Sequence, residues 1–139
     1  MNSQSRYVVF LTVATLILTA CAQASPADDL LTGTEWELVA YRKTSPIAGT
    51  TITASFEDGE IRGSGGCNSY FGSYSIDGNG LTIEGLAWTE MACLNPEGVM
   101  QQEQEIMGYL SASEQFEFED GRLIIQVGGH ETLTFEPVE

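Results

Sequence analysis

Short runs of alternating apolar and polar residues, separated by tight turns, constrain the fold of this chain most. In the run "TEWELVAY", Trp36, Leu38 and Ala40 fall on one face, as they do in a half-buried β-strand. Gly-containing turns such as "DGE" and "DGNG" join neighbouring runs, and connections this short favour antiparallel pairing. We therefore expect about eight mostly antiparallel strands, at 34–41, 51–56, 61–65, 70–76, 81–86, 115–119, 122–127 and 131–136.

One segment, "NPEGVMQQEQEIMGYL", has helical periodicity and breaks this pattern. Asn95 suits the N-cap and Pro96 the first helical position, and Ile106 and Leu110 share one face with Glu103. The patterns together predict a β-rich α+β domain, a strongly curved or barrel-like antiparallel sheet of about eight strands with one helix packed on it. Glu103 is the one charged residue on the buried face of the helix, and an unpaired buried carboxylate is costly. We expect it to accept hydrogen bonds from backbone N–H groups of a loop or from a Tyr, with a functional carboxylate as the alternative.

The first 20 residues have the features of an export signal. Arg6 precedes an apolar run, Tyr7 to Leu18, that is too short to span a bilayer, and small residues follow. The junction "LTAC" resembles a bacterial lipoprotein signal, which implies cleavage before Cys21, lipidation of its sulfur and acylation of the new amino group. The alternative is a plain secretory signal that leaves Cys21 as a thiol.

This interpretation divides the chain into a signal (1–20), a lipidated tether (21–31) and one domain (32–139). Ala22 at the second mature position, in place of Asp, resembles the sorting pattern for the outer membrane facing the periplasm. Cleavage would leave four basic and 20 acidic residues, a formal charge of −16. Such a surface repels phosphate backbones, which excludes nucleic acid as a partner, and it repels anionic lipid headgroups. We expect the lipid on Cys21 alone to hold the protein at the membrane.

Five segments follow one another over about 31–135: "GTEWELVAY", "GSGGCNSYFGSYSIDGNGLTI", "TEMAC", the Pro-led helix and a final hairpin ending in "LTF". This series of segments resembles the META domain of HslJ-like heat-shock lipoproteins. The resemblance implies a small β-rich domain tethered to a bacterial envelope and linked to stress or drug tolerance. The family has no established catalytic residues, so the resemblance implies none here.

Cys67 and Cys93 remain when Cys21 is lipidated. An oxidising compartment and an even count favour a disulfide between them, and both lie in the motifs of the resemblance. Two buried, unpaired thiols are the alternative. A catalytic Cys67 would need a base, and a metal site would need His130, the only His of the chain, as a third ligand. Neither pattern is present, so we expect no catalytic residue, no metal and no cofactor.

Three functions remain open at this point. The first is a noncatalytic envelope lipoprotein that binds an envelope protein or supports envelope integrity under stress. The second is a binder of a small apolar ligand in the concave face of the sheet, with Trp36, Tyr70, Phe71 and Trp88 as candidate binding residues. The third is an unrecognised enzyme. A filled interior with an apolar surface patch would favour the first, and a cavity lined by these aromatic residues would favour the second.

Overall fold

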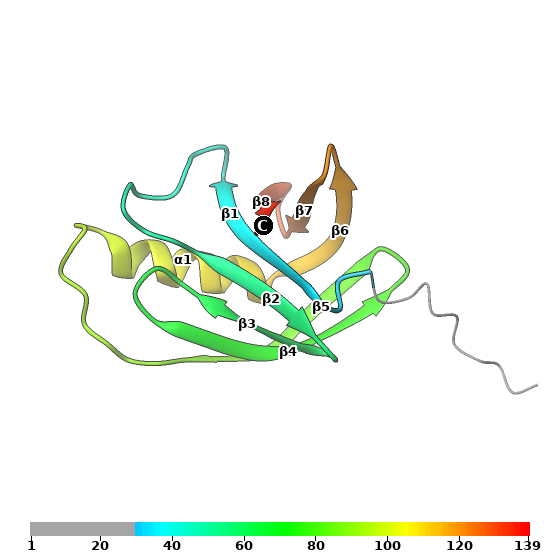
Figure 1. Ribbon diagram of the computed structural model, residues 1–139, viewed down its shortest axis with the longest axis horizontal. Helices are drawn as coiled ribbons and strands as arrows, with labels where there is room; N and C mark the ends of the chain where they lie inside the picture. Colours follow the sequence, from blue (N-terminus) through cyan, green and yellow to red (C-terminus); the bar gives the residue numbers. More distant parts are fainter. Residues whose placement is uncertain (1–29) are drawn as a thin grey trace, which may run out of the picture.

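The computed structural model describes residues 30–139, which form a closed antiparallel barrel with one helix (Figure 1). Each strand is hydrogen-bonded to the next along the chain, and β8 returns to β1. This confirms the predicted fold class. The elements are β1 (Thr34–Tyr41), β2 (Thr53–Glu57), β3 (Glu60–Ser64), β4 (Ser69–Asp77), β5 (Gly80–Trp88), α1 (Val99–Ser111), β6 (Ser113–Glu119), β7 (Arg122–Val127) and β8 (Glu131–Pro137).

Two of the turns depend on an Asp-Gly pair. Asp58 and Gly59 join β2 to β3 with φ of 45° and 82°, and Asp120 and Gly121 join β6 to β7 with φ of 50° and 77°. A two-residue hairpin turn with both φ values positive follows the right-handed twist of its strands, and Asp-Gly adopts it at low cost. These turns fix the register that sends one residue of each alternating pair into the barrel.

Buried apolar side chains fill the barrel interior. Phe56 and Tyr74 meet there edge to face, with ring centroids 5.1 Å apart. Gly63 allows two strands to come close, because a Cβ at this position would lie 1.9 Å from the carbonyl oxygen of Thr53. The largest fully buried side chains are those of Phe56, Phe135, Leu31, Ile52, Ile61, Leu81, Ile106, Leu110, Leu123, Ile125, Leu133 and Val99.

The barrel closes most weakly between β5 and β6, where one residue pair, Gly80 and Gln115, is in register. The connection between these strands contains α1, whose Ile106 and Leu110 are fully buried in the core. The expectation that Asn95 is the N-cap and Pro96 the first helical residue was wrong. The helix begins at Val99, because Gly98 has a φ of 85°, outside the helical region.

The long axis of the molecule has two different ends (Figure 1). At the hairpin end, the described chain begins at Leu30, and the turn between β4 and β5 lies nearby. At the loop end, residues 89–98 connect β5 to the start of α1, shown in yellow-green at the left of the figure. From residue 30 onward, the structure contains no helix with the length and apolar character needed to cross a bilayer.

Candidate functional site

A disulfide joins two loops at the loop end of the barrel. Cys67 lies between β3 and β4, Cys93 lies between β5 and α1, and their Cα atoms are 5.9 Å apart. The structure thus contains the disulfide that the sequence predicts. Both sulfurs are engaged with each other, so neither is a free thiol, and the ligand set of Cys67, Cys93 and His130 is not assembled.

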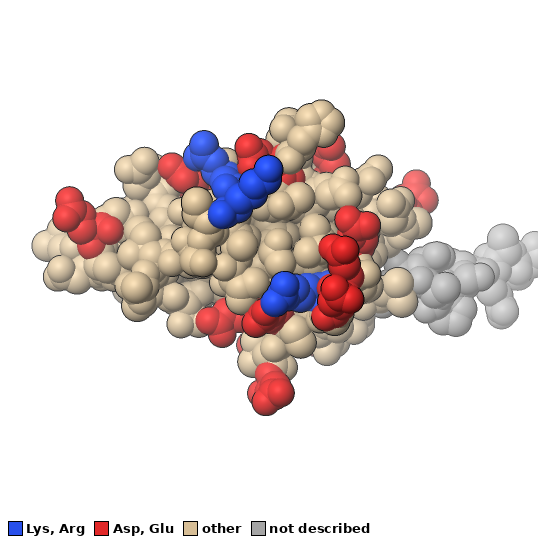
Figure 2. Space-filling view, turned by 90° about the horizontal axis from the view of Figure 1, so that it is seen from above, with Lys and Arg blue, Asp and Glu red and all other residues tan. Residues whose placement is uncertain are grey.

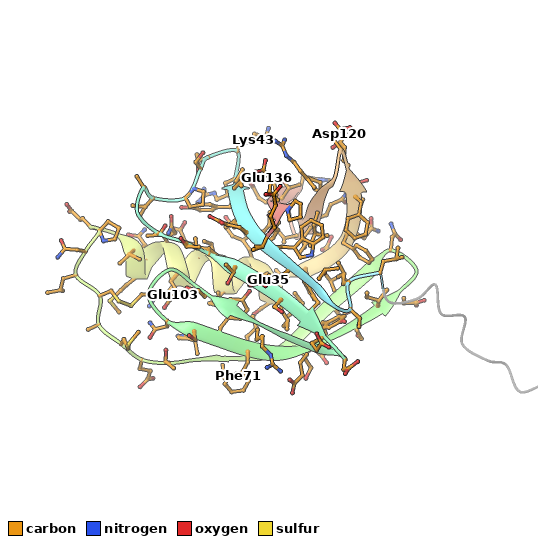
Figure 3. All side chains as sticks on the ribbon, in the orientation of Figure 1. Glu35, Lys43, Phe71, Glu103, Asp120 and Glu136 are labelled. Atoms are coloured by element: carbon orange, nitrogen blue, oxygen red, sulfur yellow. A yellow bond between two sulfur atoms is a disulfide. The ribbon has the colours of Figure 1, made fainter. Side chains whose placement is uncertain are left out.

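Glu103 extends from α1 to the loop that carries Cys67 (Figure 3). Its carboxylate is buried, and its Oε2 accepts hydrogen bonds from the backbone N–H of Cys67 at 3.1 Å and of Asn68 at 2.6 Å. A third bond runs from Nδ2 of Asn68 to Oε1 at 2.7 Å. Glu103 therefore has the predicted role as an acceptor for loop N–H groups. Gly65 leaves room for it, because a Cβ there would lie 2.7 Å from this carboxylate.

Asn68 links the same loop to the β5–α1 connection. Its side chain is buried, and its Oδ1 accepts hydrogen bonds from the hydroxyl of Thr89 at 2.8 Å and from the backbone N–H of Met91 at 2.7 Å. Its Nδ2 also donates to the carbonyl of Met91 at 3.3 Å. The disulfide, Asn68 and Glu103 together hold residues 89–93 against the barrel, and we call this group the loop clamp.

A second buried polar residue of α1 holds the connection between β1 and β2. Oε1 of Gln102 accepts a hydrogen bond from the backbone N–H of Ile47 at 2.6 Å, and its Nε2 donates to the hydroxyl of Thr50 at 3.1 Å. Two neighbouring helix residues, Gln102 and Glu103, thus position two different loops. Without such partners, each buried polar group would destabilise the fold.

The structure does not bring the four candidate aromatic residues into one cavity. Trp36 and Tyr70 are buried in the core, where the Trp36 indole N–H donates to Thr34 and the Tyr70 hydroxyl donates to the Thr53 carbonyl. Burial raises the pKa of Tyr70. Phe71 projects from the outer face of β4 and is 63% exposed (Figure 3).

Trp88 has a different setting, since it lies at the end of β5 beside a pocket of about 270 Å³. The side chains of Trp88, Met91 and Met100 are 44%, 55% and 38% exposed, and all three line this pocket. We call it the clamp pocket. Its lining residues are Asn68, Trp88, Thr89, Glu90, Met91, Ala92, Met100, Glu103 and Gln104.

Two other hollows are lined mainly by polar groups. The larger one, of about 670 Å³, lies where the β6–β7 turn meets the end of β8, and its Arg122 pairs with Glu136 at 2.8 Å. A hollow of about 230 Å³ contains His130 beside Glu114 and Glu131. Across residues 30–139, no three His, Cys, Asp or Glu side chains are grouped so that they could hold a metal ion.

Sequence reasoning missed Asn68 and Gln102, whose hydrogen bonds position the loops around α1. The one available signal for Asn68 was its place directly after Cys67, in a segment too rich in glycine to be an ordinary strand. The predicted lipidation site, Cys21, lies outside the described residues and stays a prediction.

Comparison with known proteins identifies this architecture. A family model for the META domain matches residues 29–139. The chain belongs to the META domain family. Among curated proteins, none matches it.

Three solved structures are similar to this META domain. The first is an NMR structure of a protein from Burkholderia xenovorans, whose sequence is 28% identical to this one and whose TM-score is 0.68. The match covers 81% of this chain and 86% of that protein's chain. A second NMR structure is 25% identical with a TM-score of 0.62, covering 76% and 90%. A crystal structure of a DUF4847 family protein from Bacteroides vulgatus is 13% identical with a TM-score of 0.55, covering 78% and 94%, and it shows the fold alone.

Proposed function

We propose that this chain is a lipid-anchored protein of the bacterial envelope whose META domain binds another envelope protein without catalysing a reaction. The observation that carries the proposal is the clamp pocket. Three large apolar side chains surround it and remain exposed, while the barrel interior is filled. Exposed apolar surface around a hollow is typical of an interaction site.

The loop clamp supports a docking function because it fixes the backbone that presents the pocket. Met91 is hydrogen-bonded to Asn68 through both its N–H and its carbonyl, and Cys93 is covalently tied two residues later. A surface that is already ordered loses less conformational entropy when a partner binds.

The noncatalytic part of the proposal rests on the two residues that the sequence offered as reactive groups. The sulfur of Cys67 is in the disulfide, and the carboxylate of Glu103 accepts three hydrogen bonds that hold the loop. Both groups thus have structural partners. From the resemblance to HslJ-like lipoproteins, we infer that the bound complex supports envelope integrity under stress.

The proposed anchor would orient the domain. Nine residue steps separate Cys21 from Leu30, and nine steps of extended chain span at most about 30 Å. The hairpin end would therefore lie near the outer membrane, and the clamp pocket, at the loop end, would face the periplasm (Figure 1). The disulfide suits that oxidising compartment.

The anchor is tested by Cys21→Ser in the full chain. We expect this variant to leave the membrane fraction and to collect as soluble or unprocessed protein, because no acyl chain can be attached. Membrane fractionation of cells measures this, and unchanged retention in the pellet would contradict the anchor.

Docking is tested by photo-crosslinking in intact cells. A photoreactive phenylalanine analogue replaces Met91 beside the clamp pocket, and in a matched control it replaces Phe118, which is 43% exposed on β6. We expect one defined protein adduct from position 91, absent from position 118 and lost when Trp88→Ser is added. Equal adducts at both positions, or none at position 91, would contradict protein docking at this pocket.

A further inference from the structure

We infer that the segment docking in the clamp pocket is a cationic amphipathic peptide segment of its protein partner. One apolar side chain would enter the pocket, and flanking Lys or Arg side chains would meet the acidic groups around it. This inference rests on the proposed function, since it names the chemistry of the partner at the same site.

The size of the pocket favours a single side chain. Its volume of about 270 Å³ lies below the range of roughly 300–1,000 Å³ that is typical of sites for drug-sized ligands. Met91 and Met100 form part of its wall, and methionine is a flexible, polarisable side chain that adapts to an apolar group of varied shape. Leu94 lies on the same loop, is 83% exposed and provides further apolar surface.

The charge around the pocket favours a cationic partner. Glu90 lines the pocket and is exposed, Glu97 is exposed on the same connection, and none of the lining residues is basic. Of the 20 acidic residues, 18 lie in the described part of the chain, against four of the five basic residues. Acidic rims of this kind raise the association rate of a positively charged partner and repel a negative one.

Three of the four basic residues in the described part of the chain have acidic partners of their own. Arg42 lies 3.9 Å from Glu105, Arg122 pairs with Glu136, and Arg62 hydrogen-bonds to Glu60. In the view of Figure 2, the basic side chains lie over the middle of the face, and the loop end, at the left, shows acidic side chains and no basic ones.

The same charges disfavour two other occupants. A second copy of this chain would bring one acidic rim against another, and an anionic lipid surface would be repelled in the same way. Both remain measurable outcomes, as concentration-dependent dimerisation and as binding to anionic vesicles.

The test uses the full lipidated chain in phosphatidylcholine nanodiscs and a labelled, short amphipathic peptide of Leu and Lys. Controls are the same peptide with Glu in place of Lys, a Lys peptide with Gln in place of Leu, and empty nanodiscs. Fluorescence anisotropy measures the affinity, and tryptophan emission reports where the peptide binds, because Trp88 is half-exposed whereas Trp36 is buried. The Trp88→Phe variant retains only the Trp36 emission, so the difference between the parent and this variant is the signal of Trp88.

We expect the Leu/Lys peptide alone to bind and to shift the emission of Trp88 to shorter wavelength. The double variant Glu90→Gln/Glu97→Gln should bind about threefold to tenfold more weakly, because two rim charges are lost. The matched variant Glu117→Gln/Glu119→Gln, on β6, should bind as the parent does. Thermal melts verify that both variants are folded.

Equal binding of the Lys and Glu peptides, or unchanged binding by the Glu90/Glu97 variant, would overturn the cationic assignment. Dimerisation or binding to anionic vesicles in place of peptide binding would overturn it too. An adduct at position 91 in cells without peptide binding would overturn the partner class and leave protein docking in place. If no adduct formed at position 91 in the otherwise unaltered chain, the proposed function itself would be contradicted.

Discussion

The barrel wall and the connection between β5 and α1 are held in place by different forces. The wall depends on backbone hydrogen bonds between neighbouring strands and on apolar side chains packed inside, so many residues share its stability. The connection buries few apolar groups, since Met91 and Leu94 are exposed. It depends on the disulfide of the loop clamp and on the hydrogen bonds of Asn68 and Glu103. A surface that leaves its apolar side chains exposed needs polar or covalent bonds to stay ordered.

The largest change in stability is expected in the core that α1 shares with the barrel strands. Ile106→Asp places an unpaired charge on the fully buried face of α1, and we expect a loss of more than about 4 kcal/mol in the free energy of unfolding. The control, Gln101→Asp, alters an exposed position of the same helix and should change the free energy of unfolding by about 0.5 kcal/mol or less. Thermal and urea melts measure both, and a folded Ile106→Asp protein with near-parent stability would contradict the packing of α1.

The next effect concerns the covalent part of the clamp. Replacing Cys67 and Cys93 with Ser removes a cross-link over a sequence separation of 26 residues, which the chain-entropy model values at roughly 3–4 kcal/mol. Urea unfolding of this variant and of the parent, each with and without reductant, measures the difference. Reductant should destabilise only the parent, and a loss below about 1 kcal/mol would show that the clamp does not depend on the disulfide.

The carboxylate of Glu103 should matter somewhat less. In Glu103→Ala the N–H groups of Cys67 and Asn68 lose their acceptor, and we expect a loss of about 2–4 kcal/mol. Glu105→Ala is the control on the same helix, because Glu105 makes only surface contacts, with Arg42 and Gln101. Equal stability of the parent and Glu103→Ala in thermal and urea melts would show that the fold does not depend on the hydrogen bonds of Glu103.

The smallest effect belongs to the wall. Burial raises the pKa of Tyr70 above its usual value of about 10, so the folded protein keeps the phenol proton at a pH where the unfolded chain releases it. The stabilisation is complete below pH 10 and declines as the pH rises above it. Tyr70→Phe should cost about 1 kcal/mol at neutral pH and reduce the alkaline decline. Unfolding at pH 8 and pH 11 measures both, and identical alkaline slopes would contradict this account.

Sequence predicted the wall better than the clamp because the two depend on information at different ranges. Alternation and Asp-Gly turns are local signals, and they located all eight strands of the described chain within a few residues. Glu103 was recognisable because a charge on an apolar helix face requires partners. The hydrogen bonds of Asn68 could not be derived from the sequence, because its partners Met91 and Glu103 lie 23 and 35 residues away in the chain.

The four candidate aromatic residues do not share one cavity, for two different reasons. Tyr70 and Phe71 are consecutive in β4, and consecutive residues of a strand point to opposite faces, so they cannot both face a single cavity. Periodicity also does not show that Trp88 lies where the strand leaves the wall and lines the clamp pocket. That placement depends on the long-range contacts of the clamp.

Hydrogen exchange of the Glu103→Ala protein tests most directly whether the clamp alone orders the docking surface. Under conditions where the variant is folded, we predict faster exchange at the amides of Asn68 and Met91, which are hydrogen-bonded within the clamp. The amides of β7 and β8, which pair only within the wall, should exchange as they do in the parent. Selective loss of protection in the clamp would support the account, whereas unchanged exchange, or an even loss over clamp and wall, would contradict it.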